Sequence, residues 1–345
     1  MGFLKSSSQV AALAASFALC FGGFAAPANA QELTVIQFSS VGGITDAPLY
    51  LAEEYGLFAK VGLKVERQRM NSAPSLMTSV ATGQIDAAGI SITPGLYSSV
   101  QQGVHMRIVG DKQSLSPGVS ATRLVIRTDL STGNESGDMN VLKGKKIAVS
   151  AKASSVYMLL ERLLKKHGMT FADVQVVELS YPNMMPALAS KAIDAAIDLE
   201  PFMSQALQGD VAKVVSDLTE FVPEHGAVIV PIVYSEEFAR KTKLANAFMK
   251  AYMQGARLYN DAIVKGKDRE RAIEIIARYA KVKPEIVRDS FPAGIDPNQR
   301  VSETFLDELQ TFFVKEKFLR DTIDVKKIVD LSFADAAASE LGTYK

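Results

Sequence analysis

The sequence has 345 residues, of which 48% are apolar and 22% charged, with 38 Lys and Arg against 38 Asp and Glu. This length allows two ordinary domains with a sizeable core, and the balanced charge argues against a general nucleic-acid binder. The single cysteine excludes a disulfide framework, a dithiol redox pair and a cysteine-rich metal or iron–sulfur site.

Residues 1–30 have the order of features of a secretory signal. Lys5 is their only charge, and the uncharged run 10–24 that follows is shorter than the roughly 20 residues a membrane-spanning helix needs. Ala28-Asn29-Ala30 places small residues where a signal peptidase cuts, so we expect cleavage after Ala30. Leu19 precedes Cys20 where a lipoprotein signal requires a small residue, which favours an exported protein without a lipid anchor. A buried N-terminal helix is the alternative.

Strand and helix signals alternate over residues 33–90. Short β-branched, alternating or buried apolar runs predict strands at 33–38, 63–69 and 85–90. Helices are predicted after Asp46 and after Ser72, both of which are suitable N-cap residues. The order βαβαβ predicts a doubly wound α/β sheet.

The same plan returns further along the chain. Strands are predicted at 122–127, 145–150, 174–179, 193–197 and 226–234, and helices after Ser154 or Ser155 and over 182–190. The polar stretch Asp129–Asn140 is predicted to be a surface insertion, and the pattern after Ser235 is helical, chiefly over 244–265 and 269–280.

An internal repeat links the two halves. Residues 74–88 and 182–196 share seven identities in fifteen positions, including Ile-Asp-Ala-Ala in both. Helix–strand units of similar composition can also match by chance. We expect two related lobes, with the chain crossing between them near 120–126 and 220–228. The predicted division is a signal at 1–30, lobe I at 31–121 and 226–345, and lobe II at 122–225.

Several segments resemble a known family. They are Gly42–Phe58, Val61–Val65, Ala81–Ala88, Leu142–Val149 and Ile193–Pro201. Over residues 33–335 their order is similar to periplasmic substrate-binding proteins of ABC importers, in the branch that takes nitrate, sulfonates, taurine and thiamine-pyrimidine precursors. The resemblance implies a type II periplasmic binding fold, in which two doubly wound lobes joined by a two-crossing hinge close on a ligand in the cleft between them. It also implies a monomer in the periplasm that delivers its ligand to a membrane permease driven by an ATPase.

The chain departs from better-known members of this family. Sulfonate-binding members often carry Trp beside the acidic-Pro pair, whereas here Asp198 and Leu199 precede Glu200-Pro201 and the sequence has no Trp. The family's pyrimidine-synthase branch carries a cysteine-rich iron site, which this chain lacks.

Ligands of open α/β sheets bind outside the carboxyl ends of the strands. Small hydroxyl or amide side chains at helix starts, with exposed backbone N–H groups, favour an oxyanion there. N-capping alone is the alternative role for each of them. With Asp46, the predicted ligand-binding residues of this kind are Ser39, Ser40, Asn71, Ser72, Ser91, Thr93, Ser150 and Ser154.

Three further side chains complete the predicted site. Lys112 would offset a ligand charge, or else pair with Asp111 or Glu200 or lie in solvent. Glu200 would accept a hydrogen bond from a ligand, or else bridge the lobes. Tyr181, directly after a strand, is the best candidate for an aromatic or hydroxyl contact.

No motif for chemistry is present. The three histidines match no metal-ligand spacing, and the sequence has no Walker loop, GxGxxG or GxSxG. Asp86 and Asp194 recur with the repeat and are predicted to be structural. We therefore expect a solute receptor without cofactor or metal, whose ligand is a small organic anion, either an aliphatic or aromatic carboxylate or a sulfonate. A pyrimidine or flavin-type vitamin precursor, or a ligand-sensing role in a signalling system, is the alternative.

Overall fold

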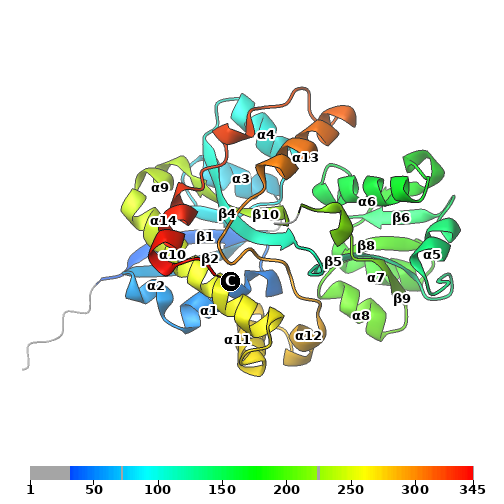
Figure 1. Cartoon of the computed structure of the whole chain (residues 1–345), viewed down its shortest axis with the longest axis horizontal. Helices are drawn as coiled ribbons and strands as arrows, with labels where there is room; N and C mark the ends of the chain where they lie inside the picture. The colour runs from blue at the N-terminus through cyan, green and yellow to red at the C-terminus, as the bar shows by residue number, and fades with distance from the viewer. Residues whose placement is uncertain (1–31, 71–72, 224–225, 345) are drawn as a thin grey trace, which may run out of the picture. The chain divides into compact units, whose positions relative to one another are not determined.

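Two five-stranded sheets with helices on both faces form the chain in this computed structural model, which describes residues 32–70, 73–223 and 226–344 (Figure 1). The predicted signal peptide and cleavage site lie outside the described residues, as do Asn71 and Ser72. From Leu33 onward the chain is one compact unit. Among the described helices, none combines the length and apolarity needed to cross a bilayer.

The two sheets have the same internal plan. The first has the order β2 (Leu63–Arg69), β1 (Thr34–Ser40), β3 (Ala87–Gly89), β10 (Ala227–Ser235), β4 (Met106–Leu115). The second has the order β7 (Gln175–Glu178), β6 (Lys146–Val149), β8 (Ala195–Leu199), β5 (Thr122–Arg127), β9 (Ala212–Ser216). In each sheet the fourth strand, β10 or β5, runs antiparallel to both neighbours. Each sheet is therefore mixed, because the pairings of β1 with β2 and β3, and of β6 with β7 and β8, are parallel.

Helices cover both faces of each sheet. Those of the first half are α1 (Ala47–Glu54), α2 (Leu57–Lys60), α3 (Ala73–Ala81) and α4 (Pro94–Gln101). Those around the second sheet are α5 (Glu135–Val141), α6 (Ser155–Lys166), α7 (Tyr181–Ala189) and α8 (Phe202–Gln208). The C-terminal helices are α9 (Glu236–Arg240), α10 (Thr242–Tyr259), α11 (Arg269–Ala280), α12 (Pro284–Asp289), α13 (Glu303–Lys315) and α14 (Ser332–Leu341).

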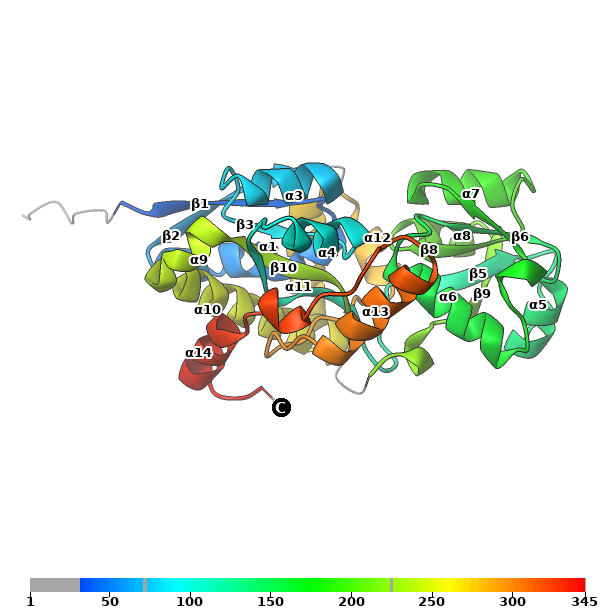
Figure 2. The ribbon, with the colours of Figure 1, turned by 90° about the horizontal axis from the view of Figure 1, so that it is seen from above.

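Alternate side chains of each strand enter different cores, as the pleat requires. One core of the first sheet lies against α1, α10 and α11, and the other against α3, α4 and α13. Figure 2 shows α10 and α3 on different sides of the first sheet. The second sheet packs one face on α5 and α6 and the other on α7 and α8.

Helix α13 packs against elements of both sheets. The buried Tyr97 hydroxyl of α4 donates to the Leu306 carbonyl at 3.0 Å. On its other side, Phe312 meets the Tyr157 ring of α6 edge-on, with 5.8 Å between the ring centroids. One apolar cluster therefore runs from the first sheet through α13 to the second.

Local signals account for several helix starts. Ser154 caps α6, with its hydroxyl accepting from the Tyr157 backbone N–H at 3.4 Å, as predicted. The stretch Asp129–Asn140 is not only a surface insertion, because it contains most of α5. Asn134 caps this helix by accepting from the Gly137 N–H at 2.8 Å, and Asp138 within it is buried. The polar composition concealed a short capped helix.

The repeated Ile-Asp-Ala-Ala segments make the same contact in each sheet. Asp86 precedes β3, and its Oδ2 accepts from the Gln37 N–H of β1 at 2.8 Å. Asp194 precedes β8, and its Oδ2 accepts from the Lys146 N–H of β6 at 2.9 Å. Each carboxylate therefore satisfies a backbone donor of the neighbouring parallel strand, which confirms the structural role predicted for both residues.

The same two residues also hold the reversed strands. The Asp86 carbonyl accepts from Ser235 at the end of β10 at 2.9 Å, and the Asp194 carbonyl accepts from Arg127 at the end of β5 at 3.0 Å. Asp194 adds an ion pair with the Arg127 guanidinium at 2.9 Å. Each aspartate thus joins three strands at one point.

Replacing either aspartate is expected to destabilise the fold. Asp86→Ala removes a charge-assisted bond to a backbone N–H and is expected to cost about 1–2 kcal/mol in urea unfolding. Asp194→Ala also removes the Arg127 pair and is expected to cost about 2–4 kcal/mol. Asp335→Ala, at an exposed position of α14, is the control. Equal small effects in all three variants would contradict the structural role.

Candidate functional site

The carboxyl end of β1 has two buried serines whose hydroxyls are already bonded. Ser39 Oγ donates to the Gln68 carbonyl of β2 at 2.9 Å. Ser40 Oγ donates to Asp46 Oδ2 at 2.6 Å and accepts from the Gly42 N–H at 3.0 Å. The Ser40 hydroxyl thereby holds the start of the Gly42–Gly43 turn, where both glycines have φ in the left-handed region that favours glycine.

Lys112 makes a buried ion pair that the sequence did not indicate. It lies within β4 with 1% of its side chain exposed, and its Nζ is 2.7 Å from Asp46 Oδ1 and 3.0 Å from Thr45 Oγ1. Neither predicted partner, Asp111 or Glu200, is used, and the charge is neutralised inside the fold. Asp46 precedes α1 but makes no side-chain capping bond, because its carboxylate is turned to Lys112 and Ser40.

Gly89 makes this burial possible. A Cβ at Gly89 would lie 2.2 Å from Lys112 Cδ, so a larger residue there would displace the lysine stem. The buried pair joins β4 to the turn before α1, and thereby holds the loop at the carboxyl end of β1 in place.

Breaking the pair is expected to be costly. Lys112→Met leaves Asp46 as an uncompensated buried charge and should lower the free energy of unfolding by about 3–5 kcal/mol. The double variant Lys112→Met/Asp46→Asn should recover part of that loss, because it removes the orphaned charge. Denaturant unfolding of the single and double variants measures both effects. A double variant as unstable as the sum of the single losses would contradict the ion-pair account.

Two of the predicted ligand-binding residues follow β3 and lie nearer the surface than Ser39 and Ser40 do. Ser91 is exposed, and Thr93 is half-buried and precedes α4 without making a side-chain capping bond. Arg69, at the end of β2, is also exposed, and its side chain lies against Gly42. Arg69 was not among the residues predicted from the sequence, although a charged residue at the end of an alternating strand was a usable signal.

At the second sheet, the ends of adjacent strands bring two predicted residues together. Ser150, after β6, has its Oγ 3.0 Å from the Tyr181 hydroxyl at the start of α7, which follows β7. Ser154 is not part of this pair; its hydroxyl caps α6 and donates to the Ala151 carbonyl at 2.6 Å. The hydroxyl pair lies where ligands of α/β sheets bind.

Glu200 is buried, and its carboxylate accepts several hydrogen bonds. Its carboxylate accepts from Ser204 Oγ at 2.8 Å, from the Ser204 N–H at 3.3 Å and from the Phe291 N–H at 3.0 Å. Burial raises its pKa, and these hydrogen bonds oppose the rise. The Phe291 contact joins the end of β8 to the segment after α12.

Two charged residues beside Glu200 were not predicted from the sequence to belong to the site. The Arg123 guanidinium of β5 stacks on the Phe291 ring, 3.8 Å from its centroid, and burial lowers its pKa. Asp198, fully buried on β8, has its pKa raised to about 7 by burial, with Glu200 adding to the rise. An acidic residue inside the apolar run 195–199 was the signal that could have identified it.

Asp111 is a second buried acid, in the middle of β4. Its Oδ2 accepts from the Asp296 N–H at 2.7 Å and from Ser114 Oγ at 2.8 Å, yet burial raises its pKa to about 8. The folded state therefore binds more protons than the unfolded state between the unfolded value of about 4 and the folded value.

The stability contributed by Asp111 should fall as the pH rises through that window. We expect Asp111→Asn to become progressively more stable relative to the wild type from about pH 4 to pH 8, with little further change above it. Urea unfolding across this range measures the difference. A difference that is independent of pH would contradict the raised pKa.

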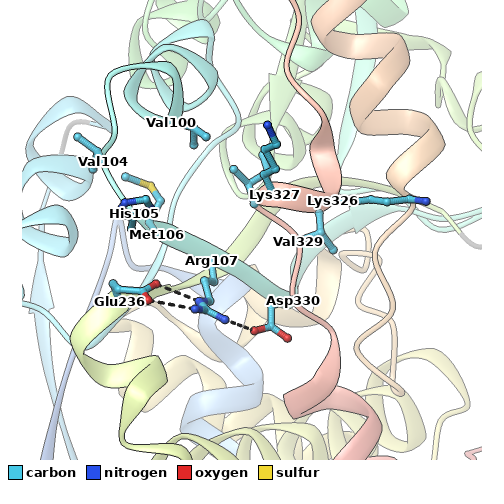
Figure 3. A pocket seen from close by; sticks show the side chains of 11 residues that line it. Val100, Val104, His105, Met106, Arg107, Glu236, Lys326, Lys327, Val329 and Asp330 are labelled. Atoms are coloured by element: carbon cyan, nitrogen blue, oxygen red, sulfur yellow. Dashed lines mark hydrogen bonds and ion pairs between the residues drawn. The ribbon is translucent and has the colours of Figure 1, made fainter.

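A separate pocket of about 280 Å³ opens beside the start of β4 (Figure 3). Its Arg107 guanidinium bonds Glu236 at 3.0 Å and Asp330 at 2.6 Å, which raises the arginine pKa and neutralises its charge. None of the predicted ligand-binding residues lines this pocket. The described residues also include no group of three or more His, Cys, Asp or Glu side chains suited to a metal ion.

Comparisons with known proteins agree with this architecture. The family model described as "NMT1-like family" matches residues 29–277. YtlA of Bacillus subtilis, which carries the name of a binding protein, is 25% identical over 329 residues, covering 92% of this chain and 94% of YtlA. The alkanesulfonate-binding protein SsuA of Xanthomonas axonopodis pv. citri, solved with MOPS, is 22% identical with a TM-score of 0.65, covering 87% of this chain and 99% of SsuA.

The same fold also occurs in an enzyme. The desulfurization enzyme DSZB is 16% identical with a TM-score of 0.61, covering 89% of this chain and 99% of DSZB. At these identities the likeness shows the fold alone. The resemblance and the two-sheet α/β fold expected from the sequence are confirmed, and the activity has to be argued from the site.

Proposed function

The chain belongs to the NMT1-like family, and from this premise we propose that it is the solute-binding component of an ABC importer. After cleavage behind Ala30 it acts in the periplasm as a monomer. It captures a small organic anion and delivers it to a permease driven by a cytoplasmic ATPase. Residues 31–121 and 226–345 form lobe I and residues 122–225 form lobe II.

The observation that carries this proposal is the matched plan of the two sheets. Each has parallel strands whose carboxyl ends carry polar groups, and the chain passes between the sheets twice, at 115–122 and 216–227. Two short crossings permit a hinge, and a ligand contacting both sets of strand ends stabilises closure.

Lobe I supplies the contacts for the acidic group of the ligand. Ser91 and Thr93 lie at the start of α4, and Arg69 provides a positive charge at the same sheet edge. Lys112 has no such role, because Asp46 neutralises it. Lobe II supplies the Ser150–Tyr181 hydroxyl pair.

The proposed activity is binding without turnover. Support comes from the relative named as a binding protein and from the sequence, which has no motif for nucleophilic, metal or cofactor chemistry. Because DSZB shares the fold, each bound compound should also be checked for chemical change by mass spectrometry. Turnover would move the chain to the enzyme class.

Ligand binding is tested by thermal-shift and calorimetric titration of the purified protein. The probes are benzoate, ethanesulfonate, nitrate and an aminopyrimidine. A ligand that binds only the folded state adds about 2.7 kcal/mol at a hundredfold excess over Kd, which raises the melting midpoint measurably. We expect a saturable shift with a carboxylate or a sulfonate.

Variants locate the binding surface. Ser91→Ala and Thr93→Val should each weaken binding about tenfold, since each loses one hydrogen bond to a charged group. Ser339→Ala, whose hydroxyl bonds within α14, is the matched control. Unchanged affinity in both site variants would show that the acidic group of the ligand does not bind beside Ser91 and Thr93. A response to the aminopyrimidine alone would favour the vitamin-precursor alternative, and no response at all would favour a sensing role.

A further inference from the structure

Asp198 has an unsatisfied hydrogen-bonding position. It is 0% exposed, its Oδ1 accepts only from the adjacent Leu199 N–H at 2.8 Å, and its Oδ2 has no partner among the described residues. A buried ionised carboxylate without a donor is unfavourable, because desolvation is not compensated. The fold therefore leaves one strong acceptor unsatisfied at this point.

The two other buried carboxylate oxygens of this kind among the described residues differ from Asp198. Asp46 Oδ1 is 2.7 Å from the Lys112 ammonium. Asp111 has two strong donors on its other oxygen and lies in the middle of β4. Asp198 instead precedes the last residue of β8, between β6 and β5, at the sheet edge where Ser150 and Tyr181 meet.

The cation opposite Asp198 in the sheet register does not pair with it. Arg123 is its register partner on β5, but the guanidinium is stacked on Phe291, and Nε donates to the Ser120 carbonyl at 3.3 Å. No ion pair joins Arg123 and Asp198 within the described residues. Glu200, two residues further on, adds negative charge. The electrostatics at this edge of lobe II favour a donor or a cation rather than a second anion.

We propose that Asp198 determines specificity by accepting a hydrogen bond from an N–H group of the ligand, such as an amine or an amino group on a ring. This inference rests on the proposed function, and it adds that the organic acid bound there carries an amino group. Lobe I binds the acidic end, and Asp198 in lobe II accepts from the amino end beside the Ser150–Tyr181 pair. A charge-assisted bond of this kind is among the stronger ones in proteins.

The test compares acids that differ only in the amino group. Calorimetric titration uses 4-aminobenzoate against benzoate and 2-aminoethanesulfonate against ethanesulfonate, with the wild type, Asp198→Asn and Asp111→Asn. In the wild type we expect the amino member of at least one pair to bind tenfold or more tightly, since its analogue leaves Oδ2 unpaired. Asp198→Asn should remove that difference, and Asp111→Asn should keep it.

The other outcomes distinguish a failure of the inference about Asp198 from a failure of the proposed function. If the wild type binds the amino-free acids equally well or better, or if Asp198→Asn still discriminates, the inference about Asp198 is overturned and the proposed function stands. If no acid of either series binds the wild type, both are overturned.

A stability measurement guards against a merely structural role. The groups facing Asp198 are Tyr181 from α7, Arg123 from β5 and Glu200 at the end of its own strand. Because the pKa of Asp198 is raised to about 7, its ionisation penalty is absent near pH 4 and complete above neutrality. Ligand-free Asp198→Asn should therefore melt a few degrees above the wild type at about pH 8 and close to it at about pH 4. A lower midpoint at both pH values would show that Asp198 holds the fold and would overturn the proposal.

Discussion

The fold depends on one hydrogen-bonding arrangement that occurs twice. In each case an aspartate joins three strands, at the start of β3 and at the start of β8. Asp86 and Asp194 satisfy a backbone N–H of the neighbouring parallel strand and use their own carbonyls to hold the reversed strand. Because one residue bonds to both neighbouring strands, this contact aligns β3 with β1 and β10, and β8 with β6 and β5. With the register set, the opposite ends of the same strands come together, and these ends form the candidate site.

The buried charges of the molecule differ in how they are compensated. Lys112 and Asp46 neutralise one another, and Glu200 is surrounded by donors, so both contribute to holding the loops beside the strand ends. Asp198 lies at the same edge as Glu200 without such compensation. A fold that satisfies its other carboxylates here and leaves one oxygen open has a polar position suited to a ligand group, because the ligand then supplies the missing partner.

Helix α13 contacts elements beside both sheets, so its packing affects the proposed hinge closure. Tyr97 of α4, beside the first sheet, donates a hydrogen bond to α13, and Phe312 of α13 packs on Tyr157 of α6 beside the second sheet. A hinge at the two crossings has to turn against these contacts, so the proposed closure is coupled to repacking around α13 as well as to the ligand.

The sequence by itself determined the three strands of residues 33–90, their counterparts in the second half, the internal repeat, the structural role of its two aspartates and the family, but not helix α5 or strand β9. These follow from hydrophobic periodicity, N-cap residues and short motifs, all of which act between residues near in the chain. Only the tertiary structure decided that Lys112 meets Asp46, that Arg123 stacks on Phe291 and that Oδ2 of Asp198 has no partner among the described residues. Ion-pair partners far apart in sequence are set by how sheets and helices pack, and no local pattern encodes which charge reaches which.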